Sequence, residues 1–174
     1  SGIRLFNSFN LAMTVSSTGA FLPANELSEI IKYSSQKIIL IVALTFSALN
    51  IYFFFSLFTN NNIIRKHYED ILILLTTIFF SLLLFVLIQE TSFLNTLLAV
   101  VSSLSNSGLT TFSPPKNFYL FFIFLTIIGG SVISNSSGIK ILRLYILFKS
   151  TVLEIFKLVS PNIIIDQRIL KTEH

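Results

Sequence analysis

Two short stretches of this sequence join an apolar segment to small polar residues that can bind a cation. They read LAMTVSSTGAFLP at residues 11–23 and LLAVVSSLSNSGLTTFSPP at residues 97–115. Each apolar part is too short to cross a bilayer but long enough for a re-entrant helix. Ser, Thr or Asn residues and then a glycine follow it, and Gly19 and Gly108 are about 90 residues apart. This spacing predicts repeated pore modules around a common axis.

The chemistry of such loops is carried by main-chain oxygens. Non-helical backbone at membrane depth is tolerated only where it is buried in protein or lines water. A glycine accepts positive φ, so neighbouring carbonyls can turn toward one axis and replace the hydration shell of a monovalent cation. The alternative is that both glycines are ordinary turns between membrane helices, but the matching flanks favour the pore. The predicted filter residues are Ser17, Thr18, Gly19, Ala20, Ser105, Asn106, Ser107 and Gly108.

A third stretch interrupts an apolar segment. Residues 118–128 (FYLFFIFLTII) give only half a crossing before the polar run GGSVISNSSGIK at residues 129–140. A break there leaves free carbonyls and amides that must face water, an ion or neighbouring side chains. We therefore expect a movable constriction below the filter, the alternative being a small-residue packing patch in a continuous helix. The predicted gate-loop residues are Gly129, Gly130, Ser134, Asn135, Ser136, Ser137 and Gly138.

Composition places these stretches in a membrane protein. Of 174 residues, 53% are hydrophobic and 11% charged, with a mean hydropathy of +0.81, whereas soluble domains are about one quarter charged. Two charge-free runs, residues 38–64 and 71–89, are each predicted to supply one helix that crosses the roughly 30 Å hydrocarbon core. The short charged segment RKHYED joins them.

The predicted fold is an all-α integral membrane protein of helix–pore-loop–helix repeats, with re-entrant loops and one broken transmembrane helix. Residues 1–59 form a partial repeat (pore loop and inner helix), and residues 60–70 a cytosolic loop. Residues 71–159 form a complete repeat, and residues 160–174 a cytosolic tail. A pore-like segment begins within the first ten residues, so we expect a chain that starts part-way through a domain, as a fragment or a truncated reading frame.

Basic residues set the orientation. Cytosolic loops of membrane proteins are enriched in Lys and Arg. We therefore expect a multi-pass protein of the cytoplasmic (inner) membrane with its C-terminus in the cytosol. The basic residues expected on the cytosolic side are Arg65, Lys66, Lys140, Arg143, Lys149 and Lys157. Lys140 and Arg143 are three residues apart on one helical face. In one interpretation they lie near the permeation path or contact lipid phosphates or a regulatory partner. In the other they only anchor the helix at the cytosolic interface.

Other functional classes find little support. The sequence has no cysteine and only two histidines, and the predicted spans contain no Asp, Glu or His, so we expect neither an enzyme nor a metal centre. The longest basic run is Arg65-Lys66, so no nucleic-acid partner is expected.

The segment IIGGSVISNSSGIKILRL resembles the signature of the Trk/Ktr/HKT superfamily of bacterial and plant potassium transporters. Six residues fall on positions of that signature: Gly129, Gly130, Ser134, Gly138, Lys140 and Arg143. Asn135 replaces the usual Thr, and Ser136 and Ser137 replace small or glycine residues.

The two loops resemble the second and third of the four pore loops in this family. Gly108 falls on a filter glycine, whereas Ala20 precedes Phe21 where the family usually has glycine. Either the register slips by one residue, or this filter position has lost its glycine.

The resemblance implies K⁺ as the transported ion, four loops that form one filter, and the broken helix as an intramembrane gate. It further implies a homodimer, a cytosolic nucleotide-binding regulatory subunit, and missing pore repeats supplied by another chain. Because two loops are too few for a ring, the alternative is a truncated or split transporter remnant with a structural or assembly role and no conduction of its own.

Overall fold

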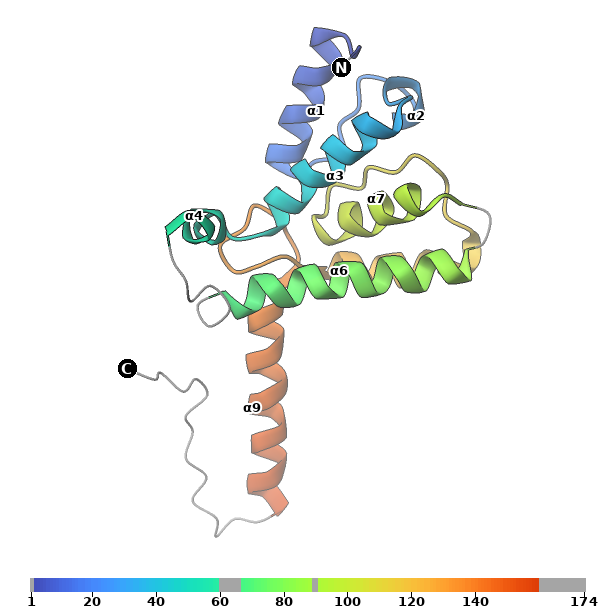
Figure 1. Cartoon of the computed structure of the whole chain (residues 1–174). Helices are drawn as coiled ribbons and strands as arrows, with labels where there is room; N and C mark the ends of the chain where they lie inside the picture. Colours follow the sequence, from blue (N-terminus) through green and yellow to red (C-terminus); the bar gives the residue numbers. More distant parts are fainter. Residues whose placement is uncertain (1, 60–66, 89–90, 160–174) are drawn as a thin grey trace.

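The computed structural model describes residues 2–59, 67–88 and 91–159, which are mostly helical (Figure 1). The predicted tail at residues 160–174 and most of the predicted loop at residues 60–70, including Arg65 and Lys66, lie outside the described residues.

The first repeat begins with α1 (Leu5–Ser17) and a short α2 (Leu27–Ile30), followed by α3 (Ser34–Ala48) and α4 (Ile51–Thr59). The prediction of one spanning helix within residues 38–64 is wrong, because Leu49 is extended, with ψ 161°, and ends α3. Asn50 then begins α4: its side-chain oxygen accepts the Tyr52 N–H at 2.9 Å and its carbonyl accepts the Phe53 N–H at 3.0 Å. An asparagine in this capping role starts a new helix.

The second repeat contains α6 (Tyr68–Leu87), α7 (Phe93–Leu104), the 3₁₀ turn η1 (Lys116–Phe118) and α8 (Tyr119–Ile127). Within the described part of the chain, α6 alone is long and apolar enough to cross a membrane. Glu69 and Asp70 lie in its first turn. Helix α6 thus begins three residues before the predicted run at residues 71–89, and the two acidic residues that were assigned to the connecting loop belong to the helix.

The predicted break in the last apolar segment is confirmed. After α8 the chain forms β1 (Ile128–Gly129), a loop, and β2 (Ile139–Lys140), which pairs with β1 in parallel, and then α9 (Ile141–Val159). The alternative of a continuous helix packed through small residues is excluded. The all-α class is also confirmed, and the structure adds a second broken helix at Leu49.

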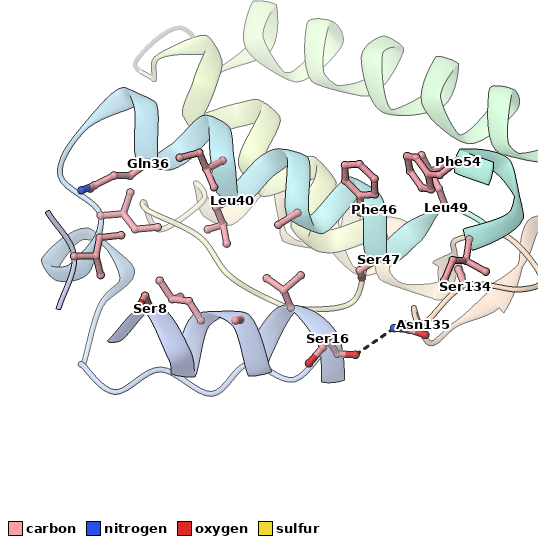
Figure 2. A pocket seen from close by; sticks show the side chains of 18 of the residues that line it. Ser8, Ser16, Gln36, Leu40, Phe46, Ser47, Leu49, Phe54, Ser134 and Asn135 are labelled. Atoms are coloured by element: carbon pink, nitrogen blue, oxygen red, sulfur yellow. Dashed lines mark hydrogen bonds between the residues drawn. The ribbon is translucent and has the colours of Figure 1, made fainter. Parts of the chain in front are cut away.

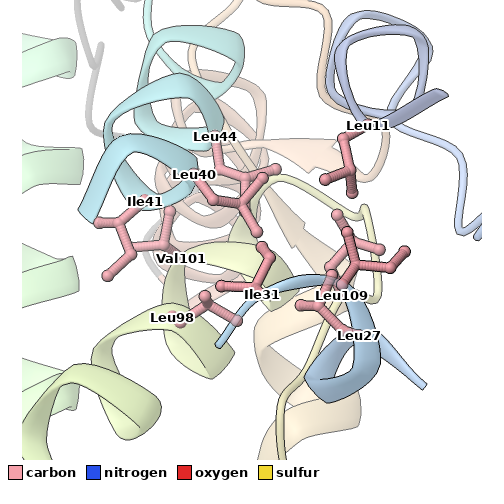
Figure 3. Close-up of a cluster of buried hydrophobic side chains, with 10 residues drawn as sticks. Leu11, Leu27, Ile31, Leu40, Ile41, Leu44, Leu98, Val101 and Leu109 are labelled. Carbon is pink, nitrogen blue, oxygen red and sulfur yellow. The ribbon is translucent and has the colours of Figure 1, made fainter. Parts of the chain in front are cut away.

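The core surrounds α7, which lies between α3 and α6 (Figure 1). On one side, Leu98 and Val101 pack with α3 through Leu44 (Figure 3). On the other side, Val100 and Leu104 pack with residues of α6 and α8. The short helix is thus enclosed by protein, as a re-entrant helix in a bilayer must be. By contrast, large apolar side chains of α6 are exposed and can face lipid, among them Leu75, Ile78, Phe79, Leu82 and Val86.

We predict that Leu98→Ala destabilises the protein, because Leu98 is fully buried between α7 and α3. The cavity should lower the free energy of unfolding by about 2 kcal/mol or more, measured by urea unfolding in detergent micelles. The matched change Leu82→Ala, on the exposed face of α6, should have a much smaller effect. Equal losses for the two variants would contradict this packing.

Candidate functional site

The two predicted pore loops begin with the same backbone geometry. Thr18 and Asn106 both adopt the left-handed conformation, with φ 51° and 60°. The next residue donates its N–H five residues back, from Gly19 to the Thr14 carbonyl at 3.2 Å and from Ser107 to the Ser102 carbonyl at 3.0 Å. Left-handed residues with such bonds are a common way to end a helix.

This geometry resolves the register left open by the sequence. Gly19 corresponds to Ser107, so Ala20 corresponds to Gly108, and the first loop has alanine at the position where the second has glycine. Gly108 has φ +66° and Ala20 is not in the positive-φ region, because an alanine Cβ disfavours that conformation. The two loops therefore diverge at this residue. The shared Val-Ser-Ser motif, which suggested the repeat, is out of register by two residues.

The loops meet at this position. A Cβ built on Gly108 would lie 3.5 Å from the Cβ of Ala20. In the second loop the serine hydroxyls are engaged within the protein: Ser107 Oγ lies 3.2 Å from Ser102 Oγ and 3.1 Å from Ser105 Oγ, and all three residues are fully buried. These hydrogen bonds hold the loop in its conformation.

The predicted gate loop lies against the break between α3 and α4 (Figure 2). The Ser131 N–H donates to the Ala48 carbonyl at 3.0 Å, and the Asn135 N–H donates to the Ser47 carbonyl at 3.2 Å. These carbonyls have lost their helical partners because α3 ends at Ala48. Gly130 permits the approach, since a Cβ there would lie 2.2 Å from the Ala48 oxygen.

Asn135 also joins the gate loop to the end of α1. Its side-chain amide donates to the Ser16 carbonyl at 3.4 Å (Figure 2). Its main-chain carbonyl accepts from the Thr18 hydroxyl at 3.4 Å. The structure thus brings all three stretches together: the two loops meet at Ala20 and Gly108, and the gate loop contacts the first of them.

Lys140 is directed into the gate loop. Its ammonium donates to the hydroxyl of Ser134 at 3.0 Å and to the carbonyl of Ser136. The Ser136 hydroxyl lies 2.8 Å from that of Ser134 and accepts the Gly130 N–H at 2.8 Å. In this conformation the Lys140 charge is bound by protein oxygens, and Arg143 is exposed at the start of α9.

Sequence reasoning missed two acidic residues that hold both helix breaks. Glu69 accepts the Val132 N–H of the gate loop at 3.1 Å. Asp70, which is 2% exposed, accepts the Asn50 N–H at the start of α4 at 2.9 Å, and its other oxygen lies 3.3 Å from His67 Nδ1. The available signal was an acidic pair directly before an apolar run, which is typical of a first helical turn.

A cavity of 930 Å³ opens between α1, α3, α4 and the gate loop (Figure 2). Its lining is mainly apolar, with Ala12 on α1 and Ala43 and Phe46 on α3. Ser134 and Asn135 of the gate loop contribute polar groups to the same cavity. The loop is therefore positioned to change the size of this cavity if it moves.

We predict that Gly130→Ala displaces the gate loop, because its Cβ cannot fit against the Ala48 oxygen. The chain has no cysteine, so Ser131→Cys can report the change: Ser131 is fully buried, and loop displacement should raise its maleimide reaction rate by at least about tenfold. Gly19→Ala in the same background is the control, since its nearest neighbour is the Ser17 hydroxyl at 3.3 Å. An unchanged rate for Gly130→Ala would disprove the close approach.

We also predict that Glu69→Ala loosens the loop. A lost hydrogen bond to a carboxylate costs about 1.5–3 kcal/mol, so the Ser131→Cys reporter should again react faster. Glu69→Gln should restore protection in part, because its amide oxygen accepts the same bond. Glu154→Ala, at an exposed site on α9, should leave the reaction rate unchanged. If it raised the rate as much as Glu69→Ala does, loss of a negative charge in general, and not loss of the Glu69 contact, would explain the result.

Comparison with known proteins supports this fold but not a closer kinship. No protein-family model matches the sequence, and no curated protein matches it. Among solved structures, the potassium transporter TrkH from Vibrio parahaemolyticus superimposes with a TM-score of 0.78 and 22% sequence identity, over 97% of this chain and 39% of the TrkH chain. The chain therefore spans about two fifths of that structure and has its fold, as the resemblance predicted.

Proposed function

We propose that the chain forms part of a K⁺ pathway across the cytoplasmic membrane. Residues 17–20 and 105–108 supply two of the filter loops, and residues 129–138 supply the gate. A shared fold does not establish a function, so the proposal depends on the site. Its central support is the close approach of Ala20 and Gly108, where two re-entrant loops meet at residues that have no acidic or basic side chain.

The gate loop supports the same assignment. It contacts the end of α1 through Asn135 and contributes to the adjoining cavity, so its movement would open or close the space behind the filter loop. Lys140 places a positive charge among loop oxygens, and a fixed cation there opposes entry of a mobile one. Release of Lys140 is the corresponding step of opening.

A complete filter requires further pore loops. We propose that these come from additional polypeptide, because TrkH, whose fold the chain shares, is a longer chain. The proposed assembly is a homodimer that contacts a cytosolic nucleotide-binding subunit, with the C-terminus of this chain on the cytosolic side. The basic residues that follow the gate support that orientation.

A second candidate is a transporter remnant with an assembly role and no conduction of its own. The observation that favours it is Ala20, because one of the two loops lacks the left-handed glycine that the other retains.

Complementation separates the two candidates. The chain is expressed alone and together with polypeptides that carry further pore repeats, in cells that lack K⁺ uptake, on low-K⁺ medium. Growth with the additional repeats is expected from the proposal. An absence of growth in both cases, with the chain present in the membrane, would favour the remnant.

In an active assembly, Gly108→Ser should lower the K⁺/Na⁺ discrimination by about tenfold, or about 1.4 kcal/mol, because serine disfavours φ +66°. Rb⁺ and Na⁺ fluxes measure it. Gly19→Ser is the matched control, since its counterpart Ser107 is already a serine, and discrimination should be retained. If Gly108→Ser left selectivity unchanged, Gly108 would not be a filter residue.

A further inference from the structure

Helix α9 begins at the level of one end of α6. The Glu69 carboxylate, in the first turn of α6, accepts the Val132 N–H and also interacts with the backbone N–H of Leu142, the second residue of α9. The 20 residues of α6 rise about 30 Å, which matches the hydrocarbon thickness of a bilayer. The first turn of α6, and with it the start of α9, therefore lies near one membrane surface.

The direction of α9 differs from that of α6. The two helices run across one another, and α9 projects away from the helices around α7 (Figure 1). A helix that starts at the membrane surface and runs across a spanning helix extends along that surface. It does not cross the bilayer beside α6.

The residues of α9 separate into two faces. Arg143, Ser150, Glu154 and Lys157 recur at spacings of seven, four and three, which places them on one side of the helix. The opposite side carries large apolar residues that are exposed in the structure: Tyr145, Phe148, Ile155 and Phe156. Lys149 lies at the edge of this side, with its ammonium 6.0 Å from the centre of the Tyr145 ring. A helix with this division can lie in a membrane interface, with its apolar side among the acyl chains.

The charge of α9 indicates which lipid it fits. It has three basic residues, Arg143, Lys149 and Lys157, and one acidic residue, Glu154. Basic residues near a membrane attract anionic headgroups, and tyrosine is favoured at the interface. We propose that α9 is an interfacial helix that lies on the cytosolic leaflet and binds anionic lipid headgroups. Because it follows Lys140 directly, the lipid surface fixes one arm of the gate loop.

Depth measurements test the geometry in the full chain. Single cysteines replace Tyr145, Phe148 and Ile155 on the apolar face, or Ser150 and Glu154 on the polar face, and carry a fluorophore in nanodiscs with brominated lipids. The expected result is equal quenching by shallow bromines at all three apolar sites and little at the polar sites. A fluorophore depth in the bilayer that increases steadily along the helix would overturn the proposal. An absence of quenching at every site would also overturn it, and is the result expected if a second copy of the chain covers this face.

A second arm tests the headgroup. In nanodiscs that contain phosphatidylglycerol, quenching at the Phe148→Cys site should exceed that in phosphatidylcholine alone by roughly twofold. The double change Arg143→Gln and Lys157→Gln should remove this difference. The double change Lys32→Gln and Lys116→Gln, at exposed sites outside α9, removes the same charge and should leave the difference unchanged. Equal quenching in both lipids for the unmodified helix would refute anionic recognition. Neither measurement depends on K⁺ transport, so the proposal for α9 can be confirmed even if the transport assay fails.

Discussion

The organisation of this chain depends on one constraint, that backbone groups freed by a helix break must find partners in a medium that offers little water. The end of α3 presents free carbonyls at Ser47 and Ala48, and the gate loop presents free N–H groups at Ser131 and Asn135. Each break satisfies the other. The first turn of α6 completes the arrangement, because its two carboxylates accept N–H groups from both interrupted helices.

The two predicted pore loops are similar in backbone geometry only in part. The two loops share their helix ends and their first left-handed residue, yet they differ two residues later, where one has glycine and the other alanine. Because Ala20 and Gly108 lie side by side, a side chain added at Gly108 would contact Ala20.

Much of this arrangement was predictable from sequence, because membrane physics restricts apolar segments strongly. The composition, the short apolar helices and the glycine-serine run predicted the re-entrant loops and the break before α9. The break at Leu49 was missed because the surrounding residues are as apolar as a spanning helix, and the capping role of Asn50 is local. The alignment of the first loop with the second could not be read from sequence, because Gly19 and Ala20 are adjacent and both small. Only the hydrogen bonds at the two helix ends show which of them corresponds to Gly108. The acidic pair was assigned to a connecting loop because the contacts that define its role come from residues distant in the chain.

The reciprocal pairing of the two breaks also has a consequence for biogenesis. A ribosome delivers α3 well before residues 131–135, so the carbonyls of Ser47 and Ala48 remain without their final partners until the second repeat has entered the membrane. The first repeat is thus an unfinished intermediate during synthesis, exposed to chaperones and membrane proteases.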